Sequence, residues 1–175
     1  MRFIGDYKAL CDGGTLEGFL ERQPPAVFLH HSAGSGLGIL SGLPGSTRNR
    51  LVLENQAGNR LPGSSAKEEA YLVFPIEPKT NGKNQPMLLG CSSTCDIFVN
   101  DATVSRKHAL IELARGDYYI MDQKSTAGTW VNGVSLRGGE KTLLTSGDRV
   151  SVGAVNLLFL LPKEFYNFVV KFLGD

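Results

Sequence analysis

Cysteine, unbalanced charge and long hydrophobic runs are scarce in this sequence, and each shortage excludes a class of protein. Three cysteines in 175 residues are too few for a disulfide framework. Lysine and arginine number 18 against 17 acidic residues, so a net charge of +1 attracts neither nucleic acid nor an anionic membrane. The longest apolar run, residues 155–161, has the length of a strand and falls far short of a membrane span. Asp6 precedes any apolar run, which argues against a secretory signal, and we expect a cytoplasmic protein with reduced thiols.

The patterns of metal sites and enzymes are incomplete. Cys91 and Cys95 lie four residues apart without a second cysteine or histidine pair, and His30–His31 has no carboxylate or cysteine partner at ligand spacing. The strand-like run before Ser32 is faintly similar to a nucleophile elbow, but a histidine occupies the first glycine position. The glycine run that follows lacks dinucleotide spacing, and no phosphate loop is present. We therefore expect no metal, no cofactor and no catalysis, and keep an enzyme in the N-terminal segment as a remote alternative.

The spacing of apolar residues divides the chain into three segments. Residues 1–69 form an N-terminal extension, which we expect to consist of short helices and loops docked on the rest of the protein. Its features are helical spacing over 7–22, strand candidates at 26–29 and 51–54, and a polar linker or loop at 59–69. Residues 70–161 and 162–175 form the second and third segments.

Residues 70–161 predict a mainly β structure, because short β-rich runs recur every eight to twelve residues between turn signals. Asn132–Gly133 indicates a type I′ hairpin, whose two central residues both need positive φ. Near-continuous apolar runs such as 109–113 favour strands in the core of a two-sheet antiparallel β-sandwich. The predicted strands are 71–76, 87–89, 97–100, 109–113, 118–122, 129–131, 134–136, 149–152 and 155–161. After Pro162, the spacing of Phe165, Phe168, Val169 and Phe172 predicts an amphipathic C-terminal helix.

A series of short motifs in residues 70–161 resembles the fork-head-associated (FHA) domain, a module that binds phosphothreonine peptides. The resemblance rests on the order and spacing of Gly90, Cys95-Asp96-Ile97, Val104-Ser105-Arg106-Lys107-His108-Ala109, Asp122, Ser125-Thr126-Ala127-Gly128-Thr129, Asn132-Gly133 and Gly147-Asp148. It implies an FHA-type β-sandwich. The flanking residues 159–166 are similar to the ends of stand-alone bacterial FHA proteins.

The resemblance also implies roles for individual residues. Ser105 would give its hydroxyl to the phosphate, Thr126 would bond it from the neighbouring loop, and Arg106 would supply a cation. Ser92 and Ser125 complete the expected phosphopeptide-binding set. Structural roles within the binding loops are expected for Gly90, His108, Gly128, Thr129 and Asn132.

Two departures from the family pattern weaken the expected phosphate site. The family usually has arginine where Cys91 stands and asparagine where Ala127 stands. A hydrogen bond to a charged group contributes roughly 1.5 to 3 kcal/mol and a neutral one about 1 kcal/mol. Their joint absence would weaken phosphothreonine binding by about 30-fold to 1000-fold. Ser92 and Ser93 could place hydroxyls near Cys91, whereas we interpret Lys79, Lys83 and Lys124 as solvated surface residues.

The sequence thus predicts a non-catalytic FHA-type interaction module in bacterial Ser/Thr kinase signalling. It would bind phosphothreonine-containing protein partners weakly or atypically, and neither nucleic acid nor a membrane. The alternative is a scaffold or adaptor that uses the FHA fold to bind an unphosphorylated partner, through other loops or the N-terminal extension.

Overall fold

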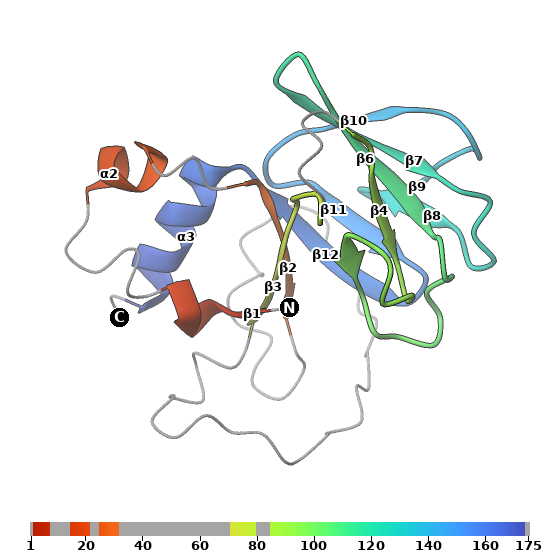
Figure 1. Cartoon of the computed structure of the whole chain (residues 1–175), viewed down its shortest axis with the longest axis horizontal. Helices are drawn as coiled ribbons and strands as arrows, with labels where there is room; N and C mark the ends of the chain where they lie inside the picture. The colour runs from red at the N-terminus through yellow and green to blue at the C-terminus, as the bar shows by residue number, and fades with distance from the viewer. Residues whose placement is uncertain (1, 8–14, 22–24, 32–70, 80–84, 174–175) are drawn as a thin grey trace.

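The protein is a sandwich of two β-sheets with helices packed against one outer face (Figure 1). The computed structural model describes residues 2–7, 15–21, 25–31, 71–79 and 85–173. All but one of the strand pairs are antiparallel, so the predicted mainly β, antiparallel sandwich is confirmed.

The first sheet has seven strands in the order β1-β3-β2-β12-β11-β8-β9. Its strands are β1 (Arg2–Phe3), β2 (Val27–His31), β3 (Tyr71–Pro75), β8 (Thr129–Val131), β9 (Val134–Ser135), β11 (Arg149–Val152) and β12 (Val155–Leu160). Asn132 and Gly133 connect β8 to β9 with φ angles of 52° and 82°. Both angles are positive, which confirms the predicted type I′ turn.

The second sheet has five strands in the order β10-β7-β6-β4-β5. Its strands are β4 (Met87–Gly90), β5 (Ile97–Phe98), β6 (Ala109–Ala114), β7 (Asp117–Asp122) and β10 (Thr142–Leu144). Strands β4 and β5 run parallel, unlike every other pair. The Asp96 carboxylate, in the connection between β4 and β5, accepts hydrogen bonds from the backbone N–H groups of Leu88 (2.8 Å) and Lys79 (2.9 Å). These two bonds fix that connection against β4.

Side chains that alternate along the strands of both sheets form the main core. In β4 and β6, Leu89 and Ile111 are fully buried, whereas Leu88 and Leu110 on the opposite faces are only half-buried. Between the sheets, Phe28 packs against Phe159 with ring centroids 5.8 Å apart. The main core therefore draws on residues 26–28 as well as on the segment from 74 to 159.

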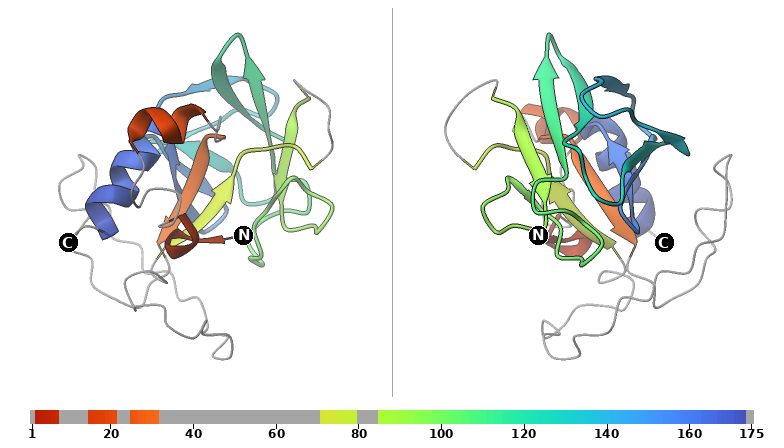
Figure 2. Two further views of the ribbon diagram at one scale, coloured as in Figure 1. Left: turned by 60° about the vertical axis from the view of Figure 1, so that its left-hand side comes forward. Right: turned by 90° about the vertical axis from the view of Figure 1, so that its right-hand side faces the viewer.

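Helices cover the outer face of the first sheet and create a second core (Figure 2). They are the 3-10 helix η1 (Ile4–Tyr7), α2 (Leu16–Glu21) and α3 (Pro162–Leu173). The ring of Phe165 in α3 packs edge-on against Tyr7 at 5.0 Å, and Phe19 in α2 packs against Tyr166 at 5.2 Å. The first part of β2, Val27–Leu29, is consequently buried on both faces, which explains why these residues are apolar without alternation.

Several predicted elements differ from the structure. The candidate strand 26–29 is β2, and it lies between β12 and β3 as a central strand of the first sheet. Strand β10 was not predicted, because it is a short edge strand that pairs with β7 alone and buries only Leu144. The predicted strand 51–54, the linker 59–69, the glycine run after Ser32 and Lys83 lie outside the described residues. The proposed boundary at residue 70 stays a prediction.

Candidate functional site

Two loops meet at one end of the sandwich, and His108 ties them together. The first loop, residues 99–108, joins β5 to β6, and the second, residues 123–128, joins β7 to β8. The buried His108 ring accepts a hydrogen bond from the Ser105 backbone N–H at Nδ1 (2.9 Å). Its Nε2 lies 2.9 Å from the carbonyl oxygen of Gly128, which can only accept. The ring is therefore neutral with its proton on Nε2, and it serves as a bridge between the loops.

The second loop is organised by Asp122, a residue that the sequence motif included but that was not assigned a role. Its buried carboxylate accepts hydrogen bonds from the hydroxyls of Ser125 (2.6 Å) and Thr129 (2.7 Å) and from the Ser125 backbone N–H (3.1 Å). Burial acts to raise the pKa of Asp122, but these hydrogen bonds outweigh it, and the pKa is lowered. In the sequence, this arrangement is indicated by an Asp that is followed by Ser three residues later and by Thr seven residues later.

The hydroxyl of Ser125 is fully engaged within its own loop. It donates to Asp122 and accepts from the Gly128 backbone N–H at 3.0 Å. A hydroxyl has one proton, so Ser125 cannot donate to a phosphate while it donates to Asp122. Its predicted role in phosphopeptide binding stays a prediction, and this geometry disfavours it.

Ser105 and Thr126 meet across the two loops with their hydroxyl protons unused. The Thr126 backbone N–H donates to Ser105 Oγ at 3.0 Å, so the Ser105 hydroxyl accepts here and keeps its proton for a ligand. Within the described residues, the Thr126 hydroxyl has no hydrogen-bond partner, and its side chain is exposed. Arg106 is exposed beside Ser105. The hydrogen bond thus brings the Ser105 hydroxyl next to Thr126, with the exposed Arg106 as its neighbour in the first loop.

The third loop, residues 91–96, begins beside Ser105. The Cys91 backbone N–H donates to the Ser105 carbonyl oxygen at 3.1 Å. A Cβ at Gly90 would lie 2.2 Å from the Arg106 carbonyl oxygen, so only glycine permits this close approach. The Ser92 hydroxyl lies 2.8 Å from that of Thr94, and the buried Cys95 thiol donates to the Arg106 carbonyl oxygen at 3.1 Å. Cys91, which is half-buried and packs against the main core, therefore begins beside the Ser105 backbone, at the position where the family usually has arginine.

The remaining predicted structural residues support the turns around the site. Gly128 has a φ of +86°, which agrees with the predicted positive φ. A Cβ at this position would also lie only 2.9 Å from the Trp130 ring. Asn132 lies in its turn, donates to the Asp148 carboxylate at 2.8 Å and accepts from the Arg149 backbone N–H at 3.0 Å. Asn132 therefore fixes the β8–β9 hairpin, and neither of these hydrogen bonds involves Ser105.

The alternative sites considered from sequence gain no support from the described residues. His30 is buried and its Nδ1 donates to the Asn156 carbonyl, whereas the adjacent His31 packs against the Tyr71 ring. Neighbouring residues of a strand point to opposite faces, so the two imidazoles cannot share one ion. No three His, Cys, Asp or Glu side chains gather as a metal site needs, within the part of the chain that the structure describes. None of the helices described there is long and apolar enough to cross a membrane.

Two histidines with a lowered pKa, the buried His108 and the half-buried His31, predict a pH-dependent stability. Burial lowers the pKa of His108, against the opposing effects of the Gly128 carbonyl and Asp122, and burial together with His30 lowers that of His31. The unfolded chain then binds protons that the folded chain does not, so stability falls as the pH drops below about 6.5. We expect urea unfolding between pH 7.5 and 5.5 to show this loss, with a slope of at most about 1.4 kcal/mol per pH unit for each histidine.

A control variant separates the two histidines. His31→Gln should remove the contribution of His31 and leave that of His108, since the two side chains lie in different parts of the fold. Asp122, whose pKa is lowered, should lose its contribution only below about pH 4, as the pH falls through its folded pKa. A stability that stays flat between pH 7.5 and 5.5 would contradict a neutral buried His108.

Comparisons with known proteins agree on one family. The family model for the FHA domain matches residues 87–153. An oxoglutarate dehydrogenase inhibitor of Corynebacterium jeikeium is 37% identical over 123 residues, which cover 65% of this chain and 83% of that protein. The glycogen accumulation regulator GarA of Mycolicibacterium smegmatis is 40% identical over 70 residues, 39% of this chain. That match spans only 42% of the regulator's own length. The N-terminal FHA domain of S. cerevisiae Rad53p, solved with a phosphothreonine peptide, is 24% identical over 55% of this chain and 90% of its own, with a TM-score of 0.46.

Proposed function

Because the chain belongs to the FHA-domain family, we propose that the loops around Ser105 bind a phosphothreonine-containing segment of a protein partner. The observation that carries the proposal is the meeting of Ser105 and Thr126, whose hydroxyls keep their protons free, beside the exposed Arg106. A phosphate dianion needs converging donors of this kind. Binding is weak or atypical, because Cys91 and Ala127 supply neither the guanidinium nor the amide of the family pattern.

We propose further that the protein acts without catalysis, as an interaction module in Ser/Thr kinase signalling. His108 contacts the backbone N–H of Ser105 and not its hydroxyl, so it cannot take the hydroxyl proton as a general base would. The relatives are named as a regulator and as an inhibitor, which supports a protein partner and, in the second case, an enzyme as the partner class.

The second candidate function is a scaffold that binds an unphosphorylated partner. The specific observation in its favour is the pair of departures at Cys91 and Ala127, which remove the strongest expected phosphate contact and a backbone anchor. Titration of the full chain with phosphothreonine peptides and their unphosphorylated counterparts, followed by fluorescence anisotropy, tests the choice. Tighter binding of the phosphorylated peptides supports the first function. Equal affinities would assign the protein to the second.

Ser105→Ala is expected to weaken phosphothreonine-peptide binding by about tenfold or more. It removes a hydroxyl donor to a charged group, which contributes roughly 1.5 to 3 kcal/mol. Isothermal titration calorimetry with one peptide measures the change. Ser135→Ala, in the exposed edge strand β9, is the matched control and should leave the affinity unchanged. Unaltered binding by Ser105→Ala would place the ligand elsewhere on the protein.

A further inference from the structure

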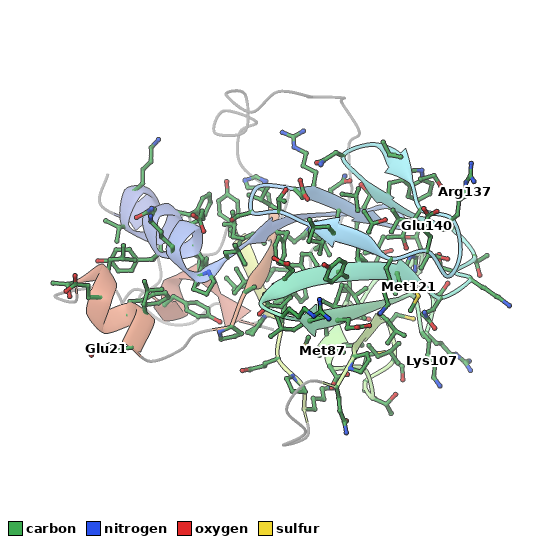
Figure 3. The ribbon with its side chains drawn as sticks, turned by 90° about the horizontal axis from the view of Figure 1, so that it is seen from above. Glu21, Met87, Lys107, Met121, Arg137 and Glu140 are labelled. Atoms are coloured by element: carbon green, nitrogen blue, oxygen red, sulfur yellow. The ribbon has the colours of Figure 1, made fainter. Side chains whose placement is uncertain are left out.

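Three basic side chains surround the recognition loops without an acidic partner. Lys107 belongs to the first loop, Lys124 to the second, and Arg137 follows β9. All three are exposed, and in the described ranges none of them has an ion pair. We call these three residues the basic rim. Figure 3 shows Lys107 and Arg137 at the same end of the molecule as Met121, away from α3 and Glu21.

The contacts between the loops bring Lys124 and Arg137 together. A Cβ at Gly138 would lie 3.9 Å from Lys124 Cγ, so the stem of the lysine runs along the segment that begins with Arg137. The Gly139 backbone N–H also donates to the Asp122 carbonyl oxygen at 3.3 Å, which fixes that segment against the second loop. The stem of Lys124 is therefore held against the segment that follows Arg137.

The acidic groups nearby do not neutralise the basic rim. Asp122 is buried and its carboxylate is occupied by Ser125 and Thr129, and Asp101 binds the Thr103 backbone N–H at 2.8 Å. Glu140 is exposed near Arg137 in Figure 3 but forms no ion pair among the described residues. Among the described residues, none of these carboxylates forms an ion pair with the basic rim, so its cations stay available to a ligand.

The backbone at Lys124 adopts the left-handed conformation. Lys124 has a φ of +56°, in the region that glycine adopts at no steric cost. Arg115, between β6 and β7, has the same φ, so this conformation by itself does not mark a binding residue. Glycine should fit the backbone at position 124 at least as well as lysine does.

From these observations we infer that the basic rim recognises anionic groups that flank the phosphothreonine, so that the partner segment is acidic. The inference rests on the proposed function, since it names the class of peptide that the same loops bind. Carboxylates of Asp or Glu and additional phosphates share the chemistry that Lys124 and Arg137 accept.

Four peptides of equal length test the inference, with and without phosphate on the central threonine and with acidic or neutral flanks. For the full chain at low salt, we expect acidic flanks to tighten binding by about threefold to tenfold, because each exposed charge pair contributes little. The gain should disappear at about 0.5 M salt, where exposed charges are screened. A phosphoserine in place of the flanking carboxylates distinguishes the two sources of negative charge.

Variants locate the effect. Lys124→Gly and Arg137→Gln should remove most of the gain from acidic flanks and weaken binding of the neutral phosphopeptide much less. Lys124→Gly should keep or raise the melting temperature, since glycine favours its φ. Glu140→Gln should increase the gain, and Lys163→Gln on α3, at the other end of the molecule, is the control.

The outcomes separate the inference from the proposed function. A gain from acidic flanks with no effect of phosphate would support the basic rim and overturn phosphothreonine binding. If phosphate tightened binding but acidic flanks did not, the inference alone would be overturned. The same would follow if all rim variants kept the full gain from acidic flanks. Displacement of the acidic peptide by a single-stranded oligonucleotide at equal charge would overturn it in favour of a nucleic-acid surface. No binding of any peptide would overturn both.

Discussion

The double variant Cys91→Arg, Ala127→Asn is expected to bind a phosphothreonine peptide about 30-fold to 1000-fold more tightly than the natural protein. The Cys91 backbone N–H donates to the Ser105 carbonyl oxygen, so residue 91 lies beside the backbone of the serine whose hydroxyl is proposed to bind the phosphate. Ala127 is exposed next to Thr126 and has room for an amide. The two side chains add a charge-assisted hydrogen bond and a neutral one, together about 2 to 4 kcal/mol.

Calorimetric titration of the natural protein, both single variants and the double variant with one peptide measures this gain. Cys91→Gln combined with Ala127→Asn is the matched control, because it offers amide donors without the charge. It should therefore give a smaller gain in affinity than the double variant with arginine. The unphosphorylated peptide should gain little. Equal binding by the natural protein and the double variant would contradict a weakened phosphate site and would direct attention to Arg106 or Lys107 as the substitute cation.

Removal of residues 1–31 is expected to abolish cooperative folding of the sandwich. Strand β2 lies between β12 and β3, so its loss together with β1 leaves β3 without strand partners, leaves one edge of β12 unpaired and exposes both cores. Circular dichroism during heating should show no sharp transition for the shortened chain. An unchanged melting curve would show instead that the N-terminal residues are an independent extension, and it would contradict the predicted docking of residues 1–69 on the sandwich.

A point variant tests the same contact without shortening the chain. Phe28→Ala should lower the free energy of unfolding by about 3 to 5 kcal/mol, because Phe28 is fully buried against Phe159 between the sheets. Leu20→Ala, on the exposed side of α2, is the control and should stay within about 0.5 kcal/mol. Denaturant unfolding measures both. A small effect of Phe28→Ala would contradict the place of β2 in the main core.

The site shows where prediction from sequence stopped. The motif around Ser105 and Thr126 indicated both loops, and the sequence alone identified Cys91 and Ala127 as departures from the family pattern. The sequence did not reveal that the Ser125 hydroxyl donates its hydrogen bond to Asp122, because the direction of a hydroxyl depends on the folded loop. Lys124 was interpreted as a solvated surface residue. Its positive φ and its position beside Gly138 became visible only in the structure.

Local chemistry in the sequence determined most of the strands, the Asn132–Gly133 turn and the start of the C-terminal helix at Pro162. Each depends on a pattern of neighbouring residues: alternation, paired positive φ angles, or a proline at the first turn. The tertiary structure alone decided that β2 pairs with β3 and β12, and that Thr126 meets Ser105. Hydrogen bonds between residues far apart in the chain depend on which surfaces meet when both cores are buried. No local pattern specifies that choice.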